Sequence, residues 1–285
     1  MTLQSAVRTC NCTQRSALVA SAVGVLLLAF ASFLPERGHA ATPSVPTRTP
    51  RQQAPLDLTG YWVSVVTEDW RFRMITAPRG DFESLFPLNE KGKEVANSWD
   101  PERDRADGAA CKAYGAAGIM RMPGRLRFSW EDDYTLRLET DAGKQVRRFR
   151  FDNSEEAVAP RESLQGTSVA QWIGIAPRVV RGFRTPGEVT HLKVVTTHMS
   201  PGYLRRNGVP YSSKTTMTEY FDIASDVDAQ WLTVTSIVED PEYLTEPFVT
   251  STDFKRQDGA EGWRPEDCRS EWGPLRVVPA ASQQR

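Results

Sequence analysis

Residues 125–151 read RLRFSWEDDYTLRLETDAGKQVRRFRF, and this stretch decides the predicted fold. It holds three runs rich in β-branched and aromatic residues, at 125–130, 135–140 and 145–151, a composition typical of β-strands. The acidic residues at 131–133 and the four residues from Asp141 to Lys144 separate the runs, and both segments have the chemistry of hairpin turns. The stretch therefore predicts three consecutive antiparallel strands.

The rest of the chain continues this pattern. Further runs of the same type occupy residues 168–175, 189–199, 214–223, 230–239 and 248–255. Residues 58–75 are predicted to form one long, bulged or bent strand. The best helix candidate is short, at 89–98, and Asp100-Pro101 ends it. The succession predicts an all-β fold with little helix, in which an antiparallel meander forms a closed barrel or two packed sheets.

Gly60-Tyr61-Trp62, near the start of the first predicted strand, resembles the opening of the lipocalin and wider calycin barrels. In those proteins the tryptophan plugs the closed end of the barrel, so the resemblance implies this role for Trp62. The family's late arginine partner for that tryptophan has no clear counterpart in the sequence. Residues 231–247 are similar to a group of exported bacterial proteins of unknown function, which implies no activity. The resemblance implies a lipocalin-like barrel.

The N-terminus has the order of a secretory signal peptide, with Arg8 and Arg15 before an apolar run at 17–34 and small residues before Ala41. We expect cleavage near Ala40-Ala41 and a periplasmic or secreted protein. An uncleaved anchor is the alternative, because the apolar run reaches the roughly 18 residues of a membrane helix. The expected divisions are a signal peptide at 1–40, a flexible Pro-rich lead-in at 41–55, a single β-rich domain at 56–270 and a C-terminal tail at 271–285.

Cleavage would leave 285 − 40 = 245 residues, with 32 basic against 35 acidic side chains and a net charge of −3. This balance has no long runs of either sign, which argues against nucleic acid or an acidic membrane as partner. No membrane span is expected after cleavage. We interpret the short cluster Arg147-Arg148-Arg150 as a solvated strand edge that charge protects from edge-to-edge pairing.

Two of the four cysteines, Cys10 and Cys12, lie in the predicted signal peptide. In an oxidising compartment the other two, Cys111 and Cys268, are expected to form a disulfide. That bond would pin the long, weakly structured region 77–118, which we interpret as a lid or covering loop.

The histidines of the mature chain, His191 and His198, are an odd seven residues apart in one predicted strand. They therefore point to opposite faces and make a poor metal pair. Neither a metal site nor a cofactor is expected.

Three carboxylates lie beside large apolar residues in predicted strands. Glu68 falls on the predicted Trp62 face of the first strand, and Glu219 and Glu239 stand near aromatic residues. A buried carboxylate needs a partner or acquires a raised pKa. A hydrolase, lyase or isomerase that uses Glu68 or Glu219 with His198 is therefore an alternative function; structural pairing of these groups is the simpler interpretation.

The segment 196–211 holds the densest mixture of functional side chains in the chain, on a turn-rich loop that contains Asn207-Gly208. Its aromatic and guanidinium groups suit a flat or anionic ligand, although a polar hairpin closed by Asn207-Gly208 is the simpler interpretation. The leading hypothesis is a barrel that binds a small, partly apolar molecule; a structural or interaction protein of the cell envelope is a further alternative. The predicted ligand-binding residues are Trp62, Trp70, Tyr203, Arg205 and Tyr211.

Overall fold

The computed structural model describes residues 48–82, 85–151, 162–175, 178–180, 183–185 and 188–272. The predicted signal peptide, with Cys10 and Cys12, lies outside the described residues, as do 41–47 of the lead-in and 273–285 of the tail. The fold is all-β, as predicted. The strands are β1 Gly60–Val65, β2 Arg125–Trp130, β3 Thr135–Thr140, β4 Val146–Arg150, β5 Thr167–Ile175, β6 Arg178–Val180, β7 Phe183–Thr185, β8 Glu188–Thr197, β9 Gly202–Arg205, β10 Val209–Tyr211, β11 Thr216–Asp226, β12 Ala229–Glu239 and β13 Phe248–Gln257.

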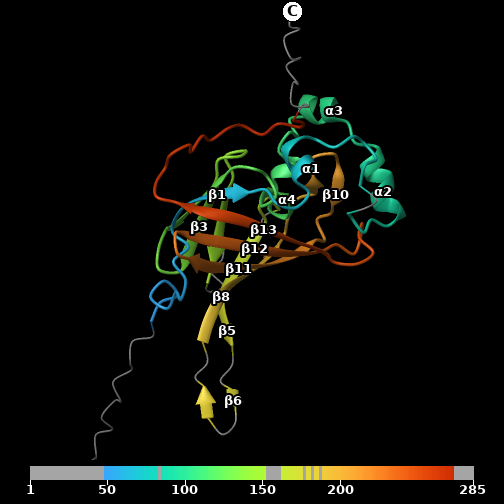
Figure 1. Cartoon of the computed structure of the whole chain (residues 1–285). Coiled ribbons are helices and arrows are strands. Elements are labelled where there is room, and N and C mark those ends of the chain that lie inside the picture. The colour runs from blue at the N-terminus through green and yellow to red at the C-terminus, as the bar shows by residue number, and fades with distance from the viewer. Residues whose placement is uncertain are drawn as a thin grey trace, which may run out of the picture. The chain divides into compact units, whose positions relative to one another are not determined.

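Nine of these strands close into a barrel in the order β1-β13-β12-β11-β8-β5-β4-β3-β2. Neighbours in sequence pair in the meanders β2-β3-β4 and β11-β12-β13. Because β1 pairs with both β2 and β13, the sheet closes on itself, so the fold is a barrel and not two packed sheets. One pair departs from the predicted antiparallel pattern, because β4 and β5 run parallel where Phe149 faces Ser168. Strands β5 and β8 continue toward the short β6-β7 ribbon, on the side of the barrel away from the helices (Figure 1).

The barrel interior is filled by side chains. Along β3 and β12 exposed and buried residues alternate, as period two requires, so one face of each strand points inward. The largest buried groups come from strands on all sides of the barrel: Trp62, Phe128, Leu136, Leu138, Phe149, Phe221, Leu232 and Phe254. Phe221 lies at the centre, with ring centroids 5.4 Å from Phe149 and 6.1 Å from Phe128. A small barrel packed in this way has a core in its middle.

Trp62 belongs to this core and has an arginine partner that the sequence did not reveal. Its side chain is fully buried, and its indole donates a hydrogen bond to the carbonyl of Leu58 at 2.8 Å. Arg256 stands opposite Trp62 on β13, and its guanidinium lies 4.6 Å from the ring. The same guanidinium donates to the carbonyls of Asp57 and Thr59. This arrangement is compatible with the lipocalin-like barrel implied by Gly60-Tyr61-Trp62.

The prediction that the first strand runs from 58 to 75 is wrong. Strand β1 ends at Val65, and Asp69 adopts a left-handed conformation (φ 46°) that starts the short helix α1 (Trp70–Met74). Glu68 and Trp70 therefore do not continue the inward face of β1, and Trp70 is 64% exposed. Aromatic residues spaced along the sequence suit a strand and a helix equally well, so the pattern did not show where the strand stops.

A covering segment between β1 and β2 contains most of the helix. After α1 come α2 Glu90–Asn97, α3 Pro101–Ala106, the 3-10 helix η1 Lys112–Tyr114 and α4 Ala116–Ile119. The side chain of Asn89 caps α2 at the amide of Gly92, and Asp100-Pro101 both ends that helical stretch and starts α3. Residues of α4 and the β9-β10 hairpin form a second apolar cluster with Met217 and Val238. Figure 1 shows these helices gathered beside the hairpin.

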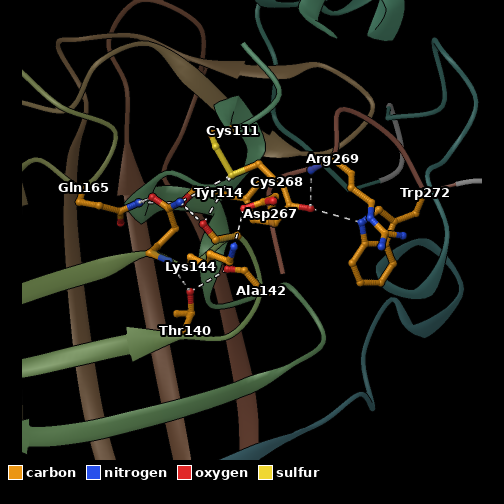
Figure 2. The surroundings of a disulfide bond; sticks show 12 residues. Cys111, Tyr114, Thr140, Ala142, Lys144, Gln165, Asp267, Cys268, Arg269 and Trp272 are labelled. Atoms are coloured by element: carbon orange, nitrogen blue, oxygen red, sulfur yellow. Dashed lines mark hydrogen bonds and ion pairs between the residues drawn. A yellow bond between two sulfur atoms is a disulfide. The ribbon is translucent and has the colours of Figure 1, made fainter. Parts of the chain in front are cut away.

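The predicted disulfide between Cys111 and Cys268 is present, across a sequence separation of 157 residues. It joins the covering segment to the C-terminal stretch that follows β13 (Figure 2). Next to the bond, the buried hydroxyl of Tyr114 accepts hydrogen bonds from the amide of Arg269 and the indole of Trp272, each at 3.2 Å. The bond therefore holds two segments distant in sequence against the same barrel end.

Residues 48–55, which were expected to be a flexible lead-in, make specific contacts with the barrel. The carbonyl of Pro50 accepts a hydrogen bond from the indole of Trp172 at 2.9 Å, and the amide of Arg51 donates to Asp133. No helix within the described ranges is long and apolar enough to cross a membrane.

Candidate functional site

The clearest candidate site is a groove outside the barrel wall, between helices α2 and α3 and the β9-β10 hairpin. Its volume is about 240 Å³, somewhat below the roughly 300–1,000 Å³ of typical small-molecule sites. Two of the predicted ligand-binding residues, Tyr203 and Tyr211, line it together. Two further aromatic side chains, Trp99 and Tyr243, complete an aromatic lining. The groove therefore brings Tyr203 and Tyr211 of the predicted loop together at the cover of the barrel, whereas Trp62 lies in the barrel core.

A charged network forms the polar side of the groove. Asp104 of α3 is 5% exposed and accepts hydrogen bonds from the ammonium of Lys112 at 2.8 Å and from the hydroxyl of Tyr203 at 2.9 Å. Burial, together with this carboxylate, raises the pKa of Tyr203 above its ordinary value. Tyr203 is thus held as a neutral donor, and Lys112 places a positive charge at the same wall.

Two buried polar atoms of groove residues lack a partner among the described residues: the indole nitrogen of Trp99 and the hydroxyl of Tyr211. Burial raises the pKa of Tyr211, which keeps that hydroxyl protonated. Glycines give the ring its space, since a methyl group at Gly202 would lie 2.5 Å from the hydroxyl. Both atoms are buried, so neither is open to the groove.

The sequence analysis missed Asp104, Lys112 and Trp99. They lie in the covering segment, where charged residues are common and no motif distinguishes one from another. The nearest signal was the predicted covering role of 77–118, which placed these residues near a site without selecting them.

Arg205 and Glu68 belong to a second group, around α1, and neither lines the groove. Glu68 accepts a hydrogen bond from Arg73 at 2.8 Å, the structural pairing that the sequence left open. Arg205 packs its guanidinium 4.3 Å from the ring of Phe72 and donates to the carbonyl of Asp81. The predicted ligand-binding residues Tyr203 and Arg205 therefore lie in different places, since only Tyr203 lines the groove.

Glu219 lies in the barrel, far from solvent, and its partner is Arg147. The two side chains form two parallel hydrogen bonds, at 3.1 and 2.5 Å, and are 0% and 1% exposed. The prediction that Arg147 belongs to a solvated strand edge is wrong, because Arg147 and Phe149 occupy the inward face of β4 while Arg148 points outward. Thr196 accepts a further hydrogen bond from Arg147 at 3.2 Å. The pair completes the barrel core.

His198 is exposed just beyond the end of β8, in a left-handed conformation with φ 56°. Its ring contacts the hydroxyl of Thr197 at 2.9 Å. The structure thus separates the three candidate catalytic residues: His198 on the surface, Glu219 inside the barrel and Glu68 beside Arg73. His191 pairs with Asp222, and no group of three or more metal-ligating side chains occurs in the part of the chain that the structure describes.

No protein-family model, no curated protein and no solved structure matches this chain.

Proposed function

We propose that this chain is an exported β-barrel protein that binds a small, partly apolar molecule in the groove between α2, α3 and the β9-β10 hairpin. The observation that carries the proposal is a groove of about 240 Å³ with aromatic walls, whose polar side is formed by Lys112, Tyr203 and the buried carboxylate of Asp104. The disulfide favours an extracytoplasmic location, where such bonds persist.

The polar groups of the groove specify the ligand's chemistry. The ammonium of Lys112 has three donors, of which one goes to Asp104 and a second to the hydroxyl of Tyr203. A ligand therefore needs a hydrogen-bond acceptor, such as a carbonyl or ether oxygen, on an otherwise flat and apolar body. The rings of Tyr203 and Tyr243 offer stacking surfaces for that body.

Native mass spectrometry of the protein purified from an exporting host tests the proposal. We expect a small molecule that co-purifies with the wild type and is lost or weakened in W99F and Y203F. Exposed counterparts, W70F and Y134F, should retain it, since Trp70 and Tyr134 are 64% and 44% exposed and do not line the groove.

A second measurement covers a ligand lost during purification. The fluorescent, flat probe anilinonaphthalene sulfonate should bind the wild type with one-to-one stoichiometry. It should bind Y203F about fivefold more weakly, because this variant loses the hydrogen bond to Asp104 that holds the groove wall, worth about 1 kcal/mol. Absence of a co-purified molecule, together with probe binding that W99F and Y203F leave unchanged, would refute the proposal.

A further inference from the structure

Four arginines from separate segments gather between α1 and the β9-β10 hairpin. Arg73 belongs to α1, Arg121 follows α4, and Arg205 and Arg206 end β9. The exposed fractions of their surfaces are only 3%, 7%, 7% and 3%, in that order. Buried arginines are rare unless each is paired with an acid, so the acids around this arginine cluster decide its charge.

Three carboxylates act on the arginine cluster. Asp69 lies 2.7 Å from Arg121 and 3.9 Å from Arg205, and Glu68 pairs with Arg73 at 2.8 Å. Asp81 acts on Arg205 through its charge. Four guanidinium groups against these three acids leave a surplus of one positive charge. Burial is the largest influence on all four arginines and lowers their pKa values, that of Arg206 to about 10.

The guanidinium groups also keep unused donors. Several of their nitrogen atoms have no hydrogen-bond partner among the described residues: Arg73 Nη2, Arg121 Nε and Nη1, Arg205 Nε and Nη2, and Arg206 Nη1. Aromatic rings hold the flat faces instead: Phe86 lies 5.7 Å from both Arg121 and Arg205. Three of the four guanidinium groups thus lie beside rings, since Trp272 is 4.1 Å from Arg206, and their N–H groups are what remains for hydrogen bonding.

A small cavity of about 20 Å³ is lined by all four arginines and by Asp69. That volume admits one water molecule or one small ion. A water molecule would accept hydrogen bonds from the arginines but would leave the positive charge uncompensated. An anion would do both, because charge-assisted hydrogen bonds to a guanidinium are the stronger kind.

We propose that this cavity is a binding site for one small monovalent anion that enters it whole, either a halide or a carboxylate of one or two carbons, held by the N–H edges of the arginine cluster. Bound there, the anion neutralises the surplus charge between α1 and the hairpin. It thereby holds the covering segment on the barrel. This site is separate from the proposed groove, with no lining residue in common.

The test compares sodium chloride, bromide, formate and acetate with sodium gluconate, whose anion is too large for the cavity, at equal ionic strength. We expect the unfolding temperature of the wild type to rise and saturate with the small anions only, since a ligand that binds the folded state stabilises it by mass action. A larger rise in unfolding temperature with the halides than with formate identifies a halide site, and the reverse identifies a carboxylate site. A crystal soaked in bromide should show an anomalous peak in the cavity.

The variant R205Q removes the surplus charge and should weaken the anion's effect by about ten- to a hundredfold, the equivalent of one charge-assisted hydrogen bond. R205K retains the positive charge, so its unfolding temperature should still rise with the small anions, by less than that of the wild type. R127Q is the control, because Arg127 also lies near an aromatic ring, at 5.7 Å from Tyr61, but is outside the cavity. An equal response to chloride and gluconate in the wild type, with no bromide peak in the cavity, would overturn the proposal.

Discussion

Replacing Glu219 by Gln should strongly destabilise the barrel. Glu219 and Arg147 are 0% and 1% exposed and share two hydrogen bonds, so the change leaves a guanidinium charge buried without its counterion. Removal of one member of such a pair costs about 3–5 kcal/mol. For a domain of this size that free energy corresponds to a fall in unfolding temperature of about 10–15 °C.

The double variant R147M/E219L separates charge from packing. It removes both charges and leaves apolar side chains of similar volume, so we expect a stability within about 1 kcal/mol of the wild type or above it. The resulting interaction energy between Arg147 and Glu219 is about 3 kcal/mol or more, well beyond the additivity of independent sites.

Urea unfolding followed by tryptophan fluorescence measures these changes, with the disulfide kept oxidised and the slope m compared between variants. R148M, at the neighbouring exposed position of β4, is the matched control and should change stability by less than about 0.5 kcal/mol. If E219Q and R147M each cost less than about 1 kcal/mol and their effects add, the reasoning fails, since water would then have to reach the pair.

The remaining predictions concern the barrel ends and the cover. Loss of the Cys111–Cys268 bond in a double Ser variant should lower stability by up to about 5 kcal/mol, because it closes a loop of 157 residues; urea unfolding measures this. R256Q should cost about 2 kcal/mol, since Arg256 loses its contact with the Trp62 ring and two hydrogen bonds to carbonyls; thermal unfolding measures it. Stability should fall as the pH rises above 10.0, the ordinary tyrosine pKa, because the raised pKa values of Tyr203 and Tyr211 keep both neutral in the folded state while the unfolded chain ionises; unfolding in a pH series shows this.

Each of these has a contrary outcome. A stability change below about 1 kcal/mol on loss of the disulfide would mean that the C-terminal stretch does not constrain the unfolded chain as its loop length implies. K255Q is the control for R256Q, since Lys255 is exposed and lies 5.8 Å from a different ring, that of Trp231; equal losses would contradict a special role for Arg256. The loss of stability at alkaline pH should become smaller in Y203F and Y211F. An unchanged loss would show that these two tyrosines are not its cause.

Local patterns predicted most of the barrel. The bounds of β2 and β3 match the predicted runs 125–130 and 135–140, and α2 falls within the predicted 89–98. The disulfide followed from the compartment and from the two cysteines beyond the predicted signal peptide. These features depend on residue type and spacing within short segments, so one sequence was sufficient for them.

The site could be predicted only in part. Tyr203 and Tyr211 do share a groove, but its other walls come from a covering segment about a hundred residues earlier. The prediction that Trp70 faces the barrel interior is wrong, because Asp69, in a left-handed conformation, starts a helix just before it. Arg256 was not recognised because its pairing with Trp62 depends on the register between the last strand and the first.

The sequence by itself determined where the strands lie, which side chains alternate along them and which cysteines pair. Only the tertiary structure decided which charges are buried: Arg147 inside the barrel, and four arginines beneath the cover. The physical reason is that alternation is a property of a single strand, whereas the burial of a charge depends on partners from distant segments. Glu219 for Arg147, and Asp69 for Arg121, are supplied by register and packing.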